Sequence, residues 1–281
     1  TSPTINNNIT LNGGTGPDGN GALWNESTSS GHTANYTGTI TLANATNSTI
    51  GNSISGIVIS GQVTGGGSLT KNGTGTLTFS GNNSYTGTTT VSAGTLTVSG
   101  AGQLGGGNYS GNISNSGNFI YASTANQTLS GIISGTGALT QNAASTLTLT
   151  GNNTSTGATT ITAGTLVLKP TSAFNGSTWS TSSNTTINSG GRLVIDTTAQ
   201  TALSSRQAVG NITVNSGGTL ELTNTVTSVD YSLWSSGTIL GSGTLIKSGA
   251  GYQQIAWNSS AGFNNFNGTV LVNAGTLGIN N

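Results

Sequence analysis

The feature that most constrains the fold is an internal repeat. Residues 65–100 and 135–170 align without a gap at an offset of 70 residues, and a third, interrupted copy runs through residues 241–279. Within the copies, apolar and polar residues alternate, as in Leu77-Thr78-Phe79, and Gly, Asn or Ser follows each short run. This period of two predicts short β-strands separated by turns. Strands so short cannot bury a face alone, so the repeat indicates coils that stack upon one another.

A finer repeat indicates the length of one coil. The tripeptide Gly-x-Leu recurs between residues 137 and 245 at intervals of 27, 27, 27 and 25 residues. We therefore expect an all-β, right-handed parallel β-helix, because parallel crossovers are right-handed. We expect residues 1–281 to form a single β-helix domain, with irregular coils in 1–60 and repeat-bearing coils in 61–281. The alternative is a β-sandwich, which explains the frequent turns but not the gap-free repeat.

The scarcity of charge is consistent with stacking. Only 4% of residues are charged, with five basic and five acidic side chains. Equivalent side chains of stacked coils lie about 4.8 Å apart, so rows of like charge would repel. We expect rows of Thr over Thr, and amide ladders at Asn82-Asn83 and Asn152-Asn153. No basic stripe exists for nucleic acid, and no residue set calls for a cofactor.

The chain contains no Cys and no Met, which favours an extracellular location in an oxidising environment. No apolar run approaches the length of a membrane span, so we expect no membrane insertion of this segment. The sequence starts at Thr1 without a leader. We expect a mature or excised segment of an exported protein.

The repeat resembles a known one. Residues 65–87 read "GGGSLTKNGTGTLTFSGNNSYTG" and are followed by "AGTL" at 93–96. This phrase resembles the passenger-associated transport repeat of bacterial autotransporters, and the likeness is close at 61–100, good at 131–168 and partial at 239–279. The resemblance implies a secreted, right-handed β-helix of the bacterial cell surface. It does not imply a particular activity, because the repeat is scaffold.

Candidate catalytic residues are few. Asp196 and Glu221 are the best carboxylate pair, because aligning their strands puts Glu221 beside Val194, with Arg192 on the same strand as Asp196. A polysaccharide-degrading enzyme could use such a cluster, but a small exposed charge cluster is the favoured explanation. His32 is the only histidine, so no zinc site is expected, and Asp18 is read as a turn residue. We expect no enzyme and no metal.

Aromatic residues allow two interpretations. Tyr residues recur just before x-Gly, as a packing ladder or as a strip on which sugars stack, and Phe266 takes the same place. The tryptophans fall outside the regular strands. The candidate contacts for host or biofilm glycans are Tyr36, Tyr85, Tyr109, Trp234 and Trp257.

The strand phrases nearest to both ends carry neither charge nor helix, the usual protections of an open β edge. We therefore expect head-to-tail contacts between copies of the chain, which would produce a filament. The alternative is a stretch cut from a longer helix. The residues expected at this assembly interface are Ile5, Ile9, Leu11, Val270, Val272, Leu277 and Ile279.

The function expected from the sequence is therefore a non-enzymatic extracellular structural protein, a subunit or segment of a bacterial surface fibre. An adhesin or carbohydrate-binding passenger is the alternative, and a polysaccharide-degrading β-helix is the third. With so few titratable groups, the stability of the fold is expected to change little between pH values of about 3 and 10.

Overall fold

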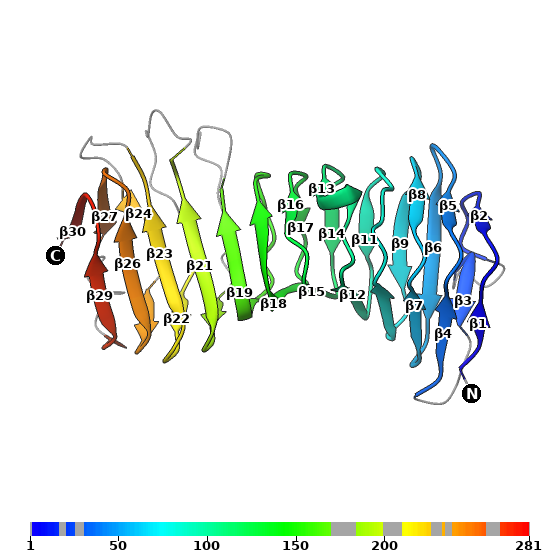
Figure 1. The fold of residues 1–281 in the computed structure, drawn as a ribbon, viewed down its shortest axis with the longest axis horizontal. Coiled ribbons are helices and arrows are strands. Elements are labelled where there is room, and N and C mark those ends of the chain that lie inside the picture. The colour runs from blue at the N-terminus through cyan, green and yellow to red at the C-terminus, as the bar shows by residue number, and fades with distance from the viewer. Residues whose placement is uncertain are drawn as a thin grey trace. The chain divides into compact units, whose positions relative to one another are not determined.

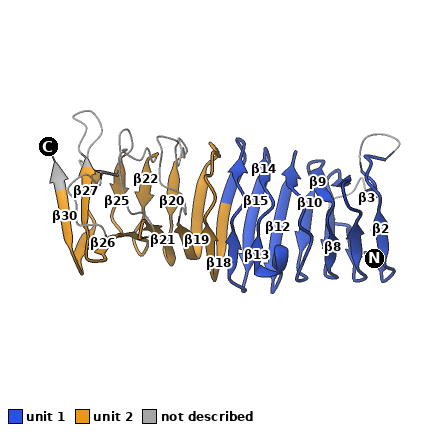
Figure 2. Cartoon of the chain, turned by 90° about the horizontal axis from the view of Figure 1, so that it is seen from above, with its two compact units in different colours: residues 1–139 blue, residues 140–281 orange. Residues whose placement is uncertain are grey.

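The computed structural model describes residues 2–16, 21–25, 31–169, 184–198, 210–225, 232–233, 238–256 and 265–280 (Figure 1). The chain divides into two compact units, Thr1–Leu139 and Thr140–Asn281 (Figure 2). Each unit is described by itself. In both, short parallel strands follow one another around a coil, and each strand pairs with the strand one coil earlier and one coil later. Such pairing buries the inward side chains of each coil under those of the next.

In unit 1 the strands form three rows, named here in the order in which the chain first visits them. The first row contains β1 (Thr4–Ile5), β4 (Thr33–Tyr36), β7 (Gly56–Ile59), β10 (Thr76–Phe79), β12 (Thr95–Gly100) and β15 (Asn118–Ser123). The second contains β2 (Ile9–Leu11), β5 (Ile40–Leu42) and β8 (Val63–Gly65). The third contains β3 (Leu23–Asn25), β6 (Asn47–Asn52), β9 (Ser68–Asn72), β11 (Thr89–Val91), β14 (Ile113–Asn115) and β17 (Ile133–Ser134). The pair β13 (Asn108–Tyr109) and β16 (Gln127–Leu129) lies between first-row and third-row strands in the chain.

Unit 2 repeats this plan. β18 (Ala138–Leu149) crosses the boundary of the units, and β19 (Thr159–Leu168) contributes to two rows. The row of β28 continues from the first half of β19 through β20 (Thr185–Ile187), β22 (Ile212–Val214), β25 (Ile239–Gly241) and β28 (Asn265–Phe266). The row of β29 contains the second half of β19, β21 (Gly191–Asp196), β23 (Thr219–Thr223), β26 (Thr244–Ser248) and β29 (Thr269–Val272). The row of β30 contains β24 (Ser232–Leu233), β27 (Tyr252–Ala256) and β30 (Thr276–Asn280).

The core consists of columns of inward side chains. In unit 1, Leu77 pairs with Ile57 and Leu96, and all three side chains are buried. The intervening threonines face outward, so Thr78 lies beside Thr97 in the expected Thr-over-Thr row. Each buried Leu or Ile contributes about 1.5–3 kcal/mol relative to an exposed one. The strands are stable because the inward side chains of each coil are buried against those of the neighbouring coils.

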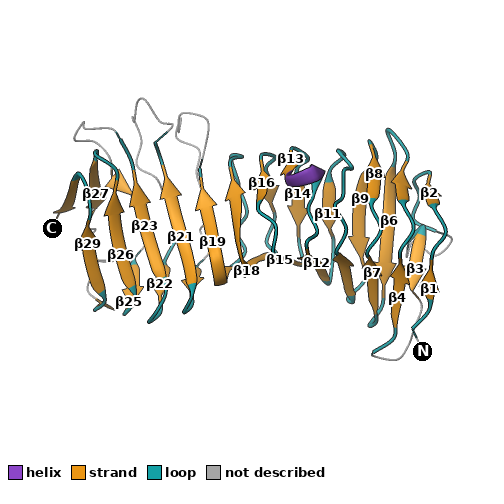
Figure 3. Cartoon of the chain, viewed as in Figure 1, coloured by secondary structure: helices purple, strands orange, loops and turns teal. Residues whose placement is uncertain are grey.

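The predicted fold class is confirmed: the described chain is all-β, with parallel strands stacked as a solenoid. The single helical segment among the described residues is the 3₁₀ turn η1 (Gly105–Gly107) (Figure 3). The coil length expected from Gly-x-Leu is confirmed in unit 2, where Leu166, Leu193, Leu220 and Leu245 are successive register partners. The single domain over 1–281 stays a prediction.

Certain glycines are required because coils approach closely at their turns. Gly73 has φ +76°, and a Cβ there would collide with the carbonyl oxygen of Asn52 in the preceding coil. Gly249 has the same φ of +76° and would collide with the carbonyl oxygen of Asn224. Only glycine combines a positive φ with such a close backbone approach at little cost. The Lys-x-Gly spacing of the first and third sequence copies therefore specifies a turn.

Candidate functional site

The last described coil presents an apolar surface. β28, β29 and β30 each pair with the strand of the preceding coil, and no strand among the described residues lies on their other edge. Val270, Leu271 and Val272 of β29 are exposed, at 40%, 42% and 52%. By contrast, their inward register counterparts in β26, Leu245 and Lys247, are both 0% exposed. The inward residues of β29 therefore continue the core columns, and no coil among the described residues covers them.

The first coil presents the opposite surface. β1, β2 and β3 each pair with a strand of the following coil, and within the described residues their outer edges carry no strand. Ile5 and Ile9 are half-buried, and Leu11 is 5% exposed because it packs against Leu42 of β5. The strands of the two end coils contain no charged residue, so no charge in them opposes the addition of another strand.

The structure places the residues predicted for assembly on these two coils. Ile5 lies on β1, Ile9 and Leu11 on β2, and Val270 and Val272 on β29. Leu277 is half-buried on β30, and Ile279 belongs to the same strand, although its side chain lies outside the described ones. These positions are compatible with an assembly interface, which stays a prediction.

Two further residues of this surface were not among those predicted for assembly. Leu23 is the inward residue of β3, where it pairs with the buried Ile50. Phe266 continues the inward column of Val214 and Gly241 in the row of β28. Both lie on strands of two or three residues, which are too short to show a period of two. For Leu23 the sequence gives no other signal, whereas Phe266 shares with the tyrosines the place before x-Gly, and the packing-ladder interpretation of that place agrees with its inward direction.

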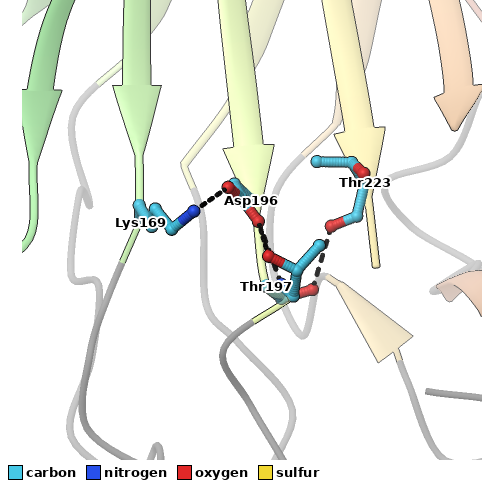
Figure 4. Close-up of polar contacts among 5 residues, drawn as sticks. Lys169, Asp196, Thr197 and Thr223 are labelled. Carbon is cyan, nitrogen blue, oxygen red and sulfur yellow. Dashed lines mark hydrogen bonds and ion pairs between the residues drawn. The ribbon is translucent and has the colours of Figure 1, made fainter. Parts of the chain in front are cut away.

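The acidic residues Asp196 and Glu221 are neighbours, as predicted. Register pairs Val194 with Glu221, which puts the two carboxylates on adjacent strands of the outer face. Each is held by a base: Lys169 Nζ lies 2.8 Å from Asp196 Oδ2, and Arg192 bonds Glu221. Ser248 Oγ also donates to Glu221. Figure 4 shows Lys169 reaching Asp196.

The environment of Asp196 favours its ionised form. Burial by itself raises the pKa of this carboxyl, but hydrogen bonds from Lys169 and from the hydroxyl and backbone of Thr198 outweigh burial, and the pKa is lowered overall. An acid for glycoside cleavage needs a raised pKa. A paired carboxylate with a lowered pKa fits the alternative reading of this cluster, a surface ion pair that joins adjacent coils.

The tyrosines predicted as glycan contacts lie inside the coil. Tyr36, Tyr85 and Tyr109 are 5%, 0% and 1% exposed. The rings of Tyr85 and Tyr109 pack at 5.4 Å between centroids. Their hydroxyls share Thr89 Oγ1 at 2.7 Å each, and burial raises the pKa of Tyr109 to about 12. Buried rings offer no face to a sugar, so this part of the glycan prediction is corrected in favour of packing.

The remaining predicted glycan contacts, Trp234 and Trp257, lie outside the described residues, and so does Asp18. Among the residues that the structure describes, no three His, Cys, Asp or Glu side chains gather as metal ligands would. No helix in the described ranges is long and apolar enough to cross a membrane.

A buried lysine is the most unusual group in unit 1. Lys71 of β9 is 0% exposed, although lysine is almost never fully buried. Its Nζ donates to the carbonyl oxygens of Asn72 and Gly73, both at 2.7 Å, and of Ala93 in the next coil, at 3.4 Å. Burial lowers the pKa of Lys71 to about 8. The lysine thus ties its own turn to the turn of the following coil.

Unit 2 contains the same arrangement. Lys247 is also 0% exposed and donates to the carbonyl oxygens of Ser248, Gly249 and Ala274, at 2.6, 2.7 and 3.3 Å. In the second sequence copy Gln141 takes this position, and its Nε2 donates to Ala143 and Ser145 oxygens. We call Lys71 and Lys247 with their three carbonyls the lysine clamps. The sequence alone does not distinguish these two lysines from surface lysines, since their inward direction is a property of the register.

The expected amide ladder takes a different form at Asn83. This side chain is buried, its Oδ1 accepts from Val63 N at 2.9 Å, and its Nδ2 donates to Gly81 and Gln103 oxygens. Asn83 therefore bonds the backbone of neighbouring coils, and its neighbours at this corner are not asparagines. The prediction of Asn over Asn is wrong here, because backbone groups at the turn need partners.

The family comparison agrees with these clamps and turns. The model of the Passenger-associated-transport-repeat matches residues 69–98, 139–168 and 245–279, about a third of the chain. Three segments of the chain are therefore similar to this repeat. Each match begins at the inward leucine that stands two residues before Lys71, Gln141 or Lys247. The resemblance inferred from the sequence is thereby confirmed, and it indicates an autotransporter passenger-like β-helix of an exported or cell-surface protein. No curated protein and no solved structure matches the chain.

Proposed function

We propose that the protein is a non-enzymatic structural component of an exported bacterial surface fibre, in which copies join head-to-tail through their end coils. The observation that carries this proposal is the exposure of Val270 and Val272, whose inward counterparts one coil earlier are fully buried. A second copy could cover them with its own first coil. Because the two surfaces differ, the contact is heterologous and does not close on itself.

The chemistry of the described residues supports a structural role. The best carboxylate pair, Asp196 and Glu221, is engaged in ion pairs, and the candidate glycan contacts Tyr36, Tyr85 and Tyr109 are buried. Passenger-type repeats belong to exported scaffolds, which agrees with a fibre at the cell surface. The absence of Cys and Met suits long residence outside the cell.

The test is concentration-dependent assembly of the purified 281-residue chain, followed by sedimentation and electron microscopy. We expect filaments that lengthen with concentration. The double variant Val270→Asp/Val272→Asp should remain dispersed, because two buried carboxylates at the contact would be unpaired. Ile54→Asp is the matched control: it adds a charge at a turn residue that is 54% exposed and lies outside both end coils. Discrete particles of the unmodified chain at high concentration would refute the proposal.

A further inference from the structure

Resting on the proposed fibre, we infer its register: β2 of one copy adds to β29 of the next, with Ile9 over Val270, Thr10 beside Leu271 and Leu11 over Val272. β1 then continues the row of β28, and β3 continues the row of β30. For each strand of the last coil, the inference names the strand of the other copy that pairs with it. It rests on the pairing that the structure shows between successive coils.

The first step concerns which backbone groups face which way. In a parallel ladder, alternate residues of a strand bond to its two neighbours. On β2 the inward residues turn their backbone toward β5: Ile9 N donates to Thr39 O and Leu11 O accepts from Ala43 N, both at 2.9 Å. The backbone groups of Thr10 consequently point to the outer edge of β2.

β29 has the complementary arrangement. Its outward residues turn their backbone toward β26, since Thr269 N donates to Gly243 O and Asn273 N to Lys247 O, both at 2.9 Å. The backbone groups of Val270 and Val272 therefore point to the outer edge. At its outer edge the last coil therefore presents the backbone groups of inward residues, and the first coil presents the backbone groups of the outward residue Thr10. The same combination of inward and outward residues joins β2 to β5 inside unit 1.

The second step selects one register. A slip of one residue would turn the inward side chains of β2 to the outside. With Thr10 opposite Leu271, its N–H meets Val270 O and its carbonyl meets Val272 N, and Ile9 and Leu11 cover the two exposed valines. A slip of two residues keeps the faces but leaves Val272 or Val270 uncovered. The chosen register is the one that buries both valines, which are 40% and 52% exposed without a partner.

The third step is that the other rows agree. The two-residue strand β1 would meet the two-residue strand β28, with the inward Ile5 over the inward Phe266. β3 would meet β30, with its inward Leu23 over Leu277. All three contacts join inward to inward side chains, and no charged residue lies on any of the six strands.

Disulfide cross-linking tests the register, because the chain has no cysteine of its own. Thr10 and Leu271 both point outward and are exposed. In the variant Thr10→Cys/Leu271→Cys, the Cα atoms of neighbouring copies would be about 4.8 Å apart, within the range for a disulfide. Mild oxidation of the fibres should convert most of the chain into a ladder of covalent multimers, which a reductant returns to monomer.

The matched control is Thr10→Cys/Thr269→Cys, since Thr269 also faces outward on β29 and is exposed. Its distance to Thr10 would be about 8 Å, beyond disulfide reach, so we expect at least about tenfold less cross-linking. A ladder from the Thr269 variant, or fibres of both variants without a ladder, would overturn the register and leave the fibre intact. If neither the variants nor the unmodified chain forms fibres, the proposed function itself fails, and the register with it.

Discussion

Replacing Lys71 by methionine tests the lysine clamp most directly. The substitution keeps the length and much of the volume of the side chain but removes the ammonium group that bonds Asn72, Gly73 and Ala93 oxygens. These carbonyls lie at half-buried turns and gain no other donor from the methionine. We therefore expect the Lys71→Met variant to fold with the same β content and a lower free energy of unfolding.

The size of the loss follows from the geometry. Two of the three bonds are 2.7 Å long, and a hydrogen bond to a charged group contributes about 1.5 kcal/mol or more. The two together amount to about 3 kcal/mol. Part of this is offset because the variant no longer buries a charge. The expected net loss is about 2 kcal/mol, and the glutamine found at the same place in the second copy should restore about half of it.

Denaturant unfolding followed by circular dichroism measures the loss. Lys247→Met should behave alike, because Lys247 bonds three carbonyls in the same way. Lys169→Met is the control: Lys169 is exposed and forms a surface ion pair, so its removal should cost less than about 1 kcal/mol. Stability of Lys71→Met within about 0.5 kcal/mol of the parent would refute the clamp, because its carbonyls would then find other partners.

The same clamp predicts a pH dependence. Lys71 titrates near 8 when folded and near its ordinary 10.5 when unfolded. Between these values unfolded Lys71 binds more protons than folded Lys71, so the contribution of Lys71 to the free energy of unfolding should rise with pH from about 8 to 10.5. Lys247 acts in the same direction, because burial also lowers its pKa. The pH-independence expected from composition is thus amended above pH 8. A slope equal in Lys71→Met and the parent would contradict this assignment.

Two further substitutions probe turns and core. Gly73→Ala should lower the free energy of unfolding by about 2–4 kcal/mol in denaturant unfolding, because its Cβ would collide with a backbone oxygen at a positive φ. The control is Gly106→Ala, at φ +64° with open space around it, which should lose only about 1 kcal/mol. Equal losses in the two variants would show that the backbone collision is unimportant. Tyr85→Phe should cost about 1 kcal/mol, because it removes one hydroxyl bond at Thr89 and leaves Tyr109 in place. Unchanged thermal melting of Tyr85→Phe would mean that the buried hydroxyl pair contributes nothing.

The sequence predicts the solenoid well because the repeat acts at the level of the coil. The register of Leu166, Leu193 and Leu220 follows the spacing of Gly-x-Leu, since equal coils place equal residues in line. Likewise the neighbourhood of Asp196 and Glu221 follows from aligning their strands. These relations need only the period of the sequence.

The rotation of the repeat around the coil could not be predicted. Leu69 stands in the third row of unit 1, but Leu139, its counterpart 70 residues later, follows Ala138, whose N donates to Gly117 O in the first row. The coils of unit 1 differ in length, so the same phrase reaches a different face in each copy. Whether a side chain points into the coil depends on the lengths of the coils before it, which the repeat alone does not give. The sequence therefore does not mark Lys71 as buried, and it leaves Tyr85 open to interpretation as a glycan contact.

Each strand of the described part of the chain pairs with the strands one coil before and one coil after it. A whole coil can therefore be removed or inserted while the more distant coils keep their strand partners. Removal of the stretch between Leu193 and Leu220, for example, would bring the next equivalent leucine into the vacated register. The length of such a molecule is therefore a quantity that duplication and deletion of coils can adjust in uniform steps, independently of what its ends do.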